Sequence, residues 1–581
     1  STGDLQASKH GDYRNAPSFP QGRCGRPSDY VGEVSGPRLS TSKGSEVTDS
    51  PRTAGVNITH AQPLLPHSFL FGHLPIFAKF SQSHPPDINI DTFHTWLVEN
   101  LETYFPGHEF PPPVVYLDIW PASEPLAMVT DPVAVSQFTI AKSEPKVDIV
   151  TTFFGPLTSG LDILTNEDCL WKTWHSRFNP GFSQRNLTTL VPEIVEEVSV
   201  FVERLKQGAS RGEDGWGPVF QLQERAIDLT FDVIGRAALD MRLQSQSEKS
   251  DKDLRSILVD QIRLMDMFQN VGQGRLIGRW PWHDRAIACN NKAMRDILYP
   301  QIQRKLLSDS KASLLKATVL DLALKHVDAD GAAAGTTKEE PTKEFIEQLI
   351  SNLKVFLLAG HDTTAATMCF MTKLLQDHPD CLDKLRAEHD TVLGPDPAQA
   401  APVLIASPHL LHSLQYTLGV IKETLRLYPL AATVRKSYLG YHLTGADSTV
   451  QYPMEGFGLW ASAPLIQRHP KYWPRPNDFL PERWTVAEGD PLYPSTPNTW
   501  LPFSQGPRNC IGMELASVEL RLVLVLTART LEIGEAWREW DVLRGDQATP
   551  SHTVDGQRLY RVGTGLVHPK DGMPVHVRLR K

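Results

Sequence analysis

The strongest chemical signal in the chain is a glycine-rich loop that carries a cysteine. The loop reads FSQGPRNCIG and begins at Phe503. A helix is expected over residues 513–527, so Cys510 would lie just before a helix N-terminus, where the helix dipole favours a thiolate. Arg508 adds a cation two residues earlier, and Gly512 lets backbone approach a flat ligand closely. A thiolate held in this way can serve as the single axial ligand of haem iron.

A second unusual segment, AGHDTT, occupies residues 359–364 inside a helix expected over residues 344–376. Gly360 in a helix interior costs about 1 kcal/mol relative to alanine, and two adjacent threonines add a smaller cost. A locally poor helix of this kind indicates a functional site. A close packing contact at the glycine is the alternative explanation.

Three charged residues form a further pattern upstream of the cysteine. Glu423 and Arg426 have the spacing ExxR, which places both side chains on one helix face. Alone, this pair predicts only a surface ion pair that contributes about 0.3 to 0.5 kcal/mol. The pair precedes Cys510 by about 85 residues, and the sequence PERW with Arg483 stands between them. The order of these segments makes the pattern specific.

With these segments in this order, the chain resembles the cytochrome P450 family over residues 60–581. The pattern FxxGxRxCxG is the haem-binding signature of that family. The resemblance implies a mainly α fold with small β-sheets and a long central helix over haem b. It also implies that Cys510 is the iron ligand and that Phe503, Arg508 and Gly512 contact the cofactor.

The resemblance assigns roles to the two other segments as well. Members of the family kink the AGxDTT segment over the iron at the position of Gly360. Asp362 and Thr363 fall on the acid and alcohol that relay protons and are the expected catalytic residues. An arginine like Arg483 joins the Glu/Arg pair in a buried triad, in which every charge needs a partner.

Other positions match the family only in part. Trp171 and Arg435 fall where relatives bind a haem propionate, but His175 replaces the arginine of the family's WxxxR. A histidine can donate one hydrogen bond, and it adds a positive charge when protonated. That His175 is an ordinary helix residue remains an alternative. Gln467 departs from the family's HRDP, so its role is open.

The same resemblance predicts the partners. Only 71 residues follow Cys510, too few for a fused flavin domain, so electrons are expected from NADPH through a separate flavoprotein reductase. The segments FLLAGHDTT and FSQGPRNCIG are most similar to filamentous-fungal members that act in secondary metabolism. This similarity implies a monomeric monooxygenase that inserts one atom of dioxygen into a lipophilic small molecule, such as a polyketide or terpenoid. Eukaryotic members lie on the cytosolic face of the endoplasmic reticulum; we expect that location if a native N-terminal anchor is missing from this chain, and a cytoplasmic one otherwise.

Two other function classes remain open. Some members of this fold rearrange peroxides without external electrons, although these commonly lack the acid/alcohol pair that Asp362 and Thr363 provide here. A non-catalytic haem-binding protein is the other alternative. Consumption of NADPH in the presence of a reductase would distinguish the monooxygenase from both.

The elements that must position these residues are mostly helical. Apolar residues repeat with a helical period over residues 190–206, and further helices are expected over residues 344–376 and 380–392. Strand-like segments are short and lie at residues 114–120, 433–438 and 575–579.

Composition supports one large folded unit. The 581 residues are 41% apolar and 22% charged, with 58 basic and 67 acidic side chains, which excludes wholesale disorder, collagen and coiled coil. The net charge of −9 gives no general attraction to nucleic acid, and six dispersed cysteines without a CxxC pair indicate a reducing compartment. Residues 1–57, rich in Gly, Ser and Pro, are expected to be disordered, and residues 58–581 to form the haem-thiolate domain. A surface loop is expected over residues 327–343.

Overall fold

The computed structural model describes residues 65–119, 123–209, 215–247, 253–265, 281–307, 317–325, 341–446, 450–494, 496–545, 552–563 and 566–580. The predicted disordered segment, residues 1–57, and most of the predicted loop at residues 327–343 lie outside these ranges.

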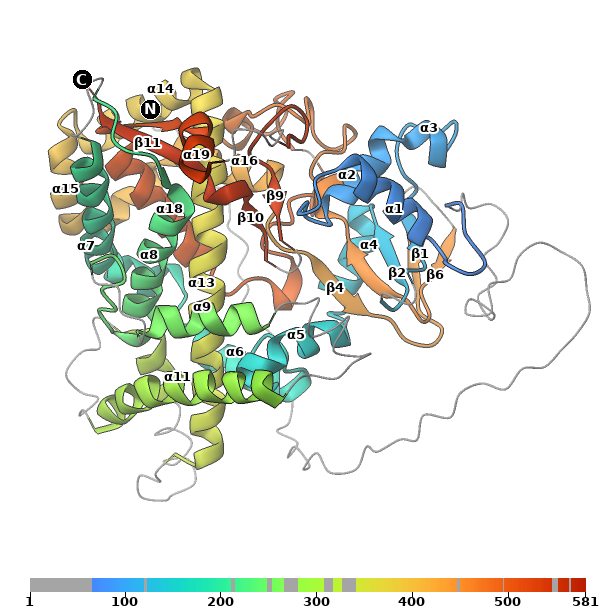
Figure 1. The fold of residues 1–581 in the computed structure, drawn as a ribbon, viewed down its shortest axis with the longest axis horizontal. Coiled ribbons are helices and arrows are strands. Elements are labelled where there is room, and N and C mark those ends of the chain that lie inside the picture. Colours follow the sequence, from blue (N-terminus) through green and yellow to red (C-terminus); the bar gives the residue numbers. More distant parts are fainter. Residues whose placement is uncertain are drawn as a thin grey trace, which may run out of the picture. The chain divides into compact units, whose positions relative to one another are not determined.

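Helices dominate the described residues, as the sequence predicts (Figure 1). The α-helices are α1 (Leu74–Ser83), α2 (Thr92–Glu99), α3 (Leu101–Tyr104), α4 (Pro132–Ser136), α5 (Asp148–Thr158), α6 (Asp168–Phe178), α7 (Gln184–Ala209), α8 (Leu222–Ile234), α9 (Leu254–Leu264), α11 (Pro281–Leu307), α13 (Lys343–Asp377), α14 (Pro379–Leu393), α15 (Ala400–Ala406), α16 (Gln415–Leu427), α17 (Ala463–Ile466), α18 (Met513–Thr527) and α19 (Trp537–Arg544). None of the described helices is both long enough and apolar enough to cross a membrane.

The strands form small sheets. They are β1 (Val114–Leu117), β2 (Leu126–Val129), β3 (Phe220–Gln221), β4 (Thr433–Lys436), β5 (His442–Thr444), β6 (Gln451–Pro453), β7 (Gly458–Ala461), β8 (Leu531–Glu535), β9 (Arg561–Val562), β10 (His568–Pro569) and β11 (Pro574–Leu579). The largest sheet has the order β1-β2-β7-β4, in which only β2 and β7 are parallel. A second has the order β3-β11-β8, and β5-β6 and β9-β10 are two-stranded. The three segments predicted as strands correspond to β1, β4 and β11.

The central element of the helical part is α13 (Figure 1). Thr342 starts it by accepting a hydrogen bond from the backbone N–H of Phe345 at 3.2 Å, and Pro379 opens the next helix two residues after its end. Most side chains of α13 are buried against α8, α16 and α18 in the main apolar core. The helix differs from the predicted range by one residue at each end.

The glycine of the AGHDTT segment serves helix packing. A Cβ on Gly360 would lie 3.0 Å from Cγ1 of Ile234 in α8, which is tighter than ordinary van der Waals contact. The helix continues without interruption through this residue. The close approach of α8 therefore explains why this position is a glycine. A close packing contact was the alternative explanation for this segment.

Candidate functional site

The cysteine loop is held in a defined conformation just before α18. The backbone N–H of Cys510 donates to the carbonyl of Phe503 at 2.8 Å, so the loop closes on itself. Gly506 has φ = 72°, and a Cβ there would lie 2.1 Å from the carbonyl oxygen of Thr139. Only glycine fits this position. The loop thereby presents the cysteine side chain three residues ahead of the first residue of α18.

Protein atoms enclose the thiol of Cys510 only in part. It is accessible to solvent although protein atoms surround it on most sides. Burial raises the pKa of this thiol, while the backbone N–H groups of Gly512 and Met513 and the charge of Lys146 lower it. The predicted stabilisation of a thiolate is thus present, but burial outweighs it. A bound metal ion would be needed to hold the sulfur deprotonated near neutral pH.

Positive side chains gather beside the cysteine loop. Arg508 forms an ion pair with Glu167 and donates to the carbonyl of Asn166 at 2.8 Å. Its guanidinium lies 4.7 Å from the ring centre of Trp171, and the ring of His175 lies 4.8 Å from the same tryptophan. Burial and the charge of Arg508 lower the pKa of His175, so its neutral form is favoured.

Two further cations complete this cluster. Arg435 is 3% exposed, and its Nε has no hydrogen-bond partner among the described residues. Burial and, to a smaller extent, the charges of Arg435 and Arg508 together lower the pKa of Lys146 to about 7, against the opposing charges of Glu167 and Asp162. The cluster therefore has more positive than negative charge. Such an excess fits the two propionate carboxylates of a haem whose iron meets Cys510.

The ExxR glutamate forms the predicted buried triad. Both oxygens of Glu423 accept from Arg426, at 2.8 and 2.9 Å, and Arg483 donates from Nε at 2.9 Å. Trp484 Nε1 and the backbone N–H of Leu480 add bonds of 3.0 and 3.1 Å. The three charged side chains are fully buried. The remaining arginine N–H groups donate to backbone carbonyls of the segment before the cysteine loop.

Gln467 connects this triad to the cysteine loop. Its Nε2 donates to the carbonyls of Leu425 and Arg426 at 3.2 and 2.8 Å, and its Oε1 accepts from the backbone N–H of Leu501 at 2.6 Å. The side chain is fully buried. The residue at which the chain departs from the family's HRDP thus has a structural role.

The two residues expected to relay protons have different surroundings in α13. Asp362 is 3% exposed, and one of its oxygens lies 3.3 Å from Nδ1 of His568 in β10. Thr363 is partly exposed and Ala359, one turn earlier, is exposed, whereas most of the helix is buried. The hydroxyl of Thr363 donates to the carbonyl of Ala359 at 2.9 Å. Small side chains thus leave one side of this turn open.

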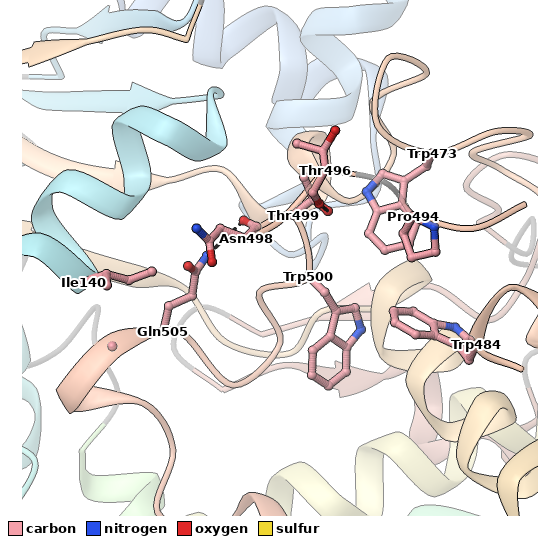
Figure 2. A pocket seen from close by; sticks show the side chains of 10 residues that line it. Ile140, Trp473, Trp484, Pro494, Thr496, Asn498, Thr499, Trp500 and Gln505 are labelled. Carbon is pink, nitrogen blue, oxygen red and sulfur yellow. Dashed lines mark hydrogen bonds between the residues drawn. The ribbon is translucent and has the colours of Figure 1, made fainter. Parts of the chain in front are cut away.

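A pocket of about 310 Å³ is lined in part by the cysteine loop (Figure 2). Its lining includes Trp473, Trp484 and Trp500 together with Gln505 and Gly506 of the loop. The ring of Trp500 lies 5.7 Å from that of Phe503, so aromatic side chains connect this pocket to the cysteine loop. Phe503 itself packs against the main core.

The motifs do not identify three residues of this region. Lys146 and Glu167 lie outside every motif of the sequence, and the contact of His568 with Asp362 joins residues that are more than 200 positions apart. The sequence shows Lys146 only as a basic residue shortly before a helix. This arrangement is too common to identify Lys146 as a functional residue. Glu167 immediately precedes α6, the helix of Trp171 and His175, and this placement was the available signal.

Comparisons with known proteins agree with this geometry. The sequence profile described as "Cytochrome P450" matches residues 108–536. The chain is 35% identical to "Cytochrome P450 monooxygenase polC" of Polytolypa hystricis, with 89% of each chain covered. It is 30% identical to "Cytochrome P450 monooxygenase acrF" of Aspergillus aculeatus, covering 79% of this chain and 93% of that one. The crystal structure of the cytochrome P450DA heme domain superposes with a TM-score of 0.65 over 90% of this chain and 98% of that one, at 20% identity, which shows the same fold.

These similarities extend over most of the chain and coincide with the cysteine loop, the buried triad and the long central helix. The chain belongs to the cytochrome P450 family and is a haem-thiolate monooxygenase.

Proposed function

We propose that this monooxygenase inserts one atom of dioxygen into a lipophilic small molecule of fungal secondary metabolism, with electrons from NADPH supplied by a separate flavoprotein reductase. The observation that carries the proposal is the solvent-accessible thiol of Cys510, which the closed loop holds just before α18 and beside a cluster with excess positive charge. The similarity to monooxygenases of two fungi supports the substrate class.

Cys510 is the proposed ligand of the haem iron, and the nearby cations are the proposed partners of its propionates. Arg435 has an unpaired buried Nε, whereas the charge of Arg508 is already matched by Glu167. Arg435 and Lys146 are therefore better placed than Arg508 to provide the compensating charge, with Trp171 and His175 as hydrogen-bond donors. Phe503 and Gly512 support the cofactor through the loop. Bound haem supplies the iron at which dioxygen is activated.

Asp362 and Thr363 are the proposed proton donors for oxygen activation. The hydroxyl of Thr363 donates its proton in a hydrogen bond to the Ala359 carbonyl, which leaves its oxygen free to accept a hydrogen bond from a water or an acid on the open side of α13. Asp362 is the adjacent acid, and one of its oxygens has no hydrogen-bond partner among the described residues. A carboxyl group with a free oxygen can pass a proton onward.

The reductase is expected to dock on the side that carries the cysteine loop, where the tryptophan-lined pocket lies (Figure 2). The enzyme is expected to act as a monomer on the cytosolic face of the endoplasmic reticulum, by analogy with eukaryotic relatives. Fractionation of cells that express the tagged native gene product tests the location, and light scattering of the purified protein tests the monomer.

The first test is the absorption spectrum of the reduced protein with carbon monoxide. Thiolate ligation by Cys510 should give a red-shifted Soret band, and Cys510→Ala should abolish this band. Cys289→Ala is a matched control, because this exposed cysteine lies in α11, away from the loop. A retained band in Cys510→Ala would overturn the assignment.

The second test adds an NADPH-dependent reductase and a panel of terpenoids and polyketides. Binding is followed by the change in haem absorbance, and turnover by oxygenated product per NADPH consumed. The proposal predicts NADPH-dependent oxygenation of at least one compound that binds. Conversion of an organic peroxide without NADPH, together with no NADPH-dependent oxygenation of any compound that binds, would favour a rearrangement enzyme instead.

A further inference from the structure

A histidine from the C-terminal part of the chain reaches the acid of α13. His568 lies in β10, which packs against α13, and its Nδ1 is 3.3 Å from Oδ1 of Asp362. The same Nδ1 is 2.7 Å from the side-chain amide of Gln223 in α8. One ring nitrogen therefore has two partners from two different helices.

The two ends of this contact differ in their access to water. The side chain of Asp362 is 5% exposed, whereas that of His568 is 34% exposed. The other carboxylate oxygen of Asp362, Oδ2, is buried and has no hydrogen-bond partner among the described residues. Thr363 does not supply that partner, since its hydroxyl is bonded to the Ala359 carbonyl. The buried carboxyl group of Asp362 thus contacts an ionisable side chain, that of His568, which water can reach.

The two partners of Nδ1 favour different protonation states of the ring. An unprotonated Nδ1 accepts a hydrogen bond from the Gln223 amide, while a protonated Nδ1 donates to the Asp362 carboxylate. The position of one proton therefore decides which partner His568 binds. Gln223 is 8% exposed, so its amide has little freedom to bind water instead.

We propose that His568 is a positioning residue that transfers protons from solvent to Asp362. Water delivers a proton to Nε2, the proton on Nδ1 passes to Oδ1 of Asp362, and the ring is left neutral with its proton on Nε2. Its Nδ1 then accepts from Gln223 until Nε2 gives its proton to water and Nδ1 takes one from water, which restores the starting tautomer with no net gain or loss of protons by the ring. One proton moves from solvent to the buried acid in each cycle. The inference rests on the proposed role of Asp362 in proton delivery.

Other titratable groups near this contact do not offer the same route. His361, the neighbour of Asp362 on α13, is fully buried and bonded to the Leu357 carbonyl. Burial lowers the pKa of His361 and outweighs the charge of Asp362 and the hydrogen bond to Leu357, which raise it. Arg255 of α9 is held by Asp228 at 2.9 Å and Glu224 at 3.2 Å. An arginine keeps its proton, so it cannot act as a relay.

The first experiment locates the proton on His568 directly. The ¹⁵N signals of the histidine ring are recorded by NMR in the diamagnetic ferrous carbonyl form of the holoenzyme, with His568→Gln used to assign them. Asp362→Leu should move the proton from Nδ1 to Nε2 and change the tautomer ratio by about tenfold, because a hydrogen bond to a charged group is lost. Gln223→Leu should change the ratio in the opposite direction. Unchanged signals in both variants would overturn the proposal.

The second experiment measures what the contact does in turnover, with 7-ethoxycoumarin as the probe substrate. His568→Gln should lower product per NADPH by about tenfold and raise hydrogen peroxide correspondingly, because proton delivery is slowed. Oxidation driven by iodosylbenzene should be unchanged, since this reagent supplies its own oxygen atom. His442→Gln is the control, because this exposed histidine of β5 bonds to the Gly440 carbonyl in its own turn.

The outcomes separate the two proposals. If Asp362→Leu and Thr363→Ala leave product per NADPH unchanged, the proposed roles of those two residues fail. If they lower it and His568→Gln does not, only the role of His568 is overturned. A loss of iodosylbenzene-driven turnover in His568→Gln would instead show that the histidine maintains the structure of the site.

Discussion

Removal of the buried glutamate is the perturbation with the largest expected effect on this protein. Glu423 is the single carboxylate between Arg426 and Arg483, and five hydrogen bonds reach its two oxygens. Substitution by alanine leaves two guanidinium groups without a counter-charge at a site where all three side chains are fully buried. Breaking a buried ion pair in this way costs about 3 to 5 kcal/mol.

This loss is a large part of the total stability of a folded protein, which is about 5 to 15 kcal/mol. We therefore expect Glu423→Ala to give little soluble protein and little bound haem. Glu423→Gln should also be destabilised, because an amide offers one acceptor where the carboxylate offers two. The readouts are the soluble yield, the haem content per chain and the urea midpoint of the purified holoprotein.

An exposed ion pair nearby provides the matched control. Lys384 lies 2.6 Å from Glu482, next to Arg483, but both side chains are partly exposed. Lys384→Ala should change stability by less than about 1 kcal/mol, since water screens such pairs. If Glu423→Ala were expressed and loaded with haem as well as Lys384→Ala, the reasoning from burial would be wrong.

Three further predictions concern single side chains. Burial raises the pKa of Glu519 from 4.5 to about 8. Between these two pH values the folded state therefore holds a proton that the unfolded chain releases. The free energy of unfolding should fall as the pH rises from 4.5 to 8. Glu519→Gln should remove this dependence and stabilise the protein by about 3 kcal/mol at pH 7 in urea unfolding; an equal gain at pH 5 would contradict the assignment. His175→Arg should retain haem at least as well as the parent when the protein is challenged with apomyoglobin, because arginine keeps its charge beside the propionates; faster haem loss would place His175 outside that contact. Thr363→Ala and Asp362→Asn should keep the haem spectrum and substrate affinity but divert more of the electrons from NADPH to the reduction of dioxygen to hydrogen peroxide. An unchanged ratio of product to NADPH would show that protons reach oxygen by another route.

The sequence predicts the elements whose signals are local. The helix after Cys510 has the expected bounds, and α13 differs by one residue at each end, because a threonine cap and a following proline mark its limits. The buried triad of Glu423 is also predicted, since its members stand in motifs of fixed order. A family resemblance adds the cofactor, which composition alone does not indicate.

Other features depend on contacts between distant segments and were missed for that reason. The surroundings of Gly360 are set by Ile234 of a different helix, so the predicted kink is replaced by close packing. The pKa of the Cys510 thiol depends on how much protein surrounds the loop, which the helix dipole does not reveal. His568 has no motif of its own, and only the packing of β10 on α13 brings it to Asp362.

The three hydrogen bonds of Gln467 have a consequence for how the protein responds to acid. An imidazole at this position would change its donors and acceptors when protonated, near the pH at which histidine titrates. A carboxamide has no such titration, and both of its ends are already used, by two carbonyls of α16 and by the backbone of Leu501. The junction between the ExxR helix and the cysteine loop therefore keeps the same bonds throughout the physiological pH range. In this enzyme, mild acidification leaves the support of the haem ligand unchanged and acts first on the ionisable groups around it.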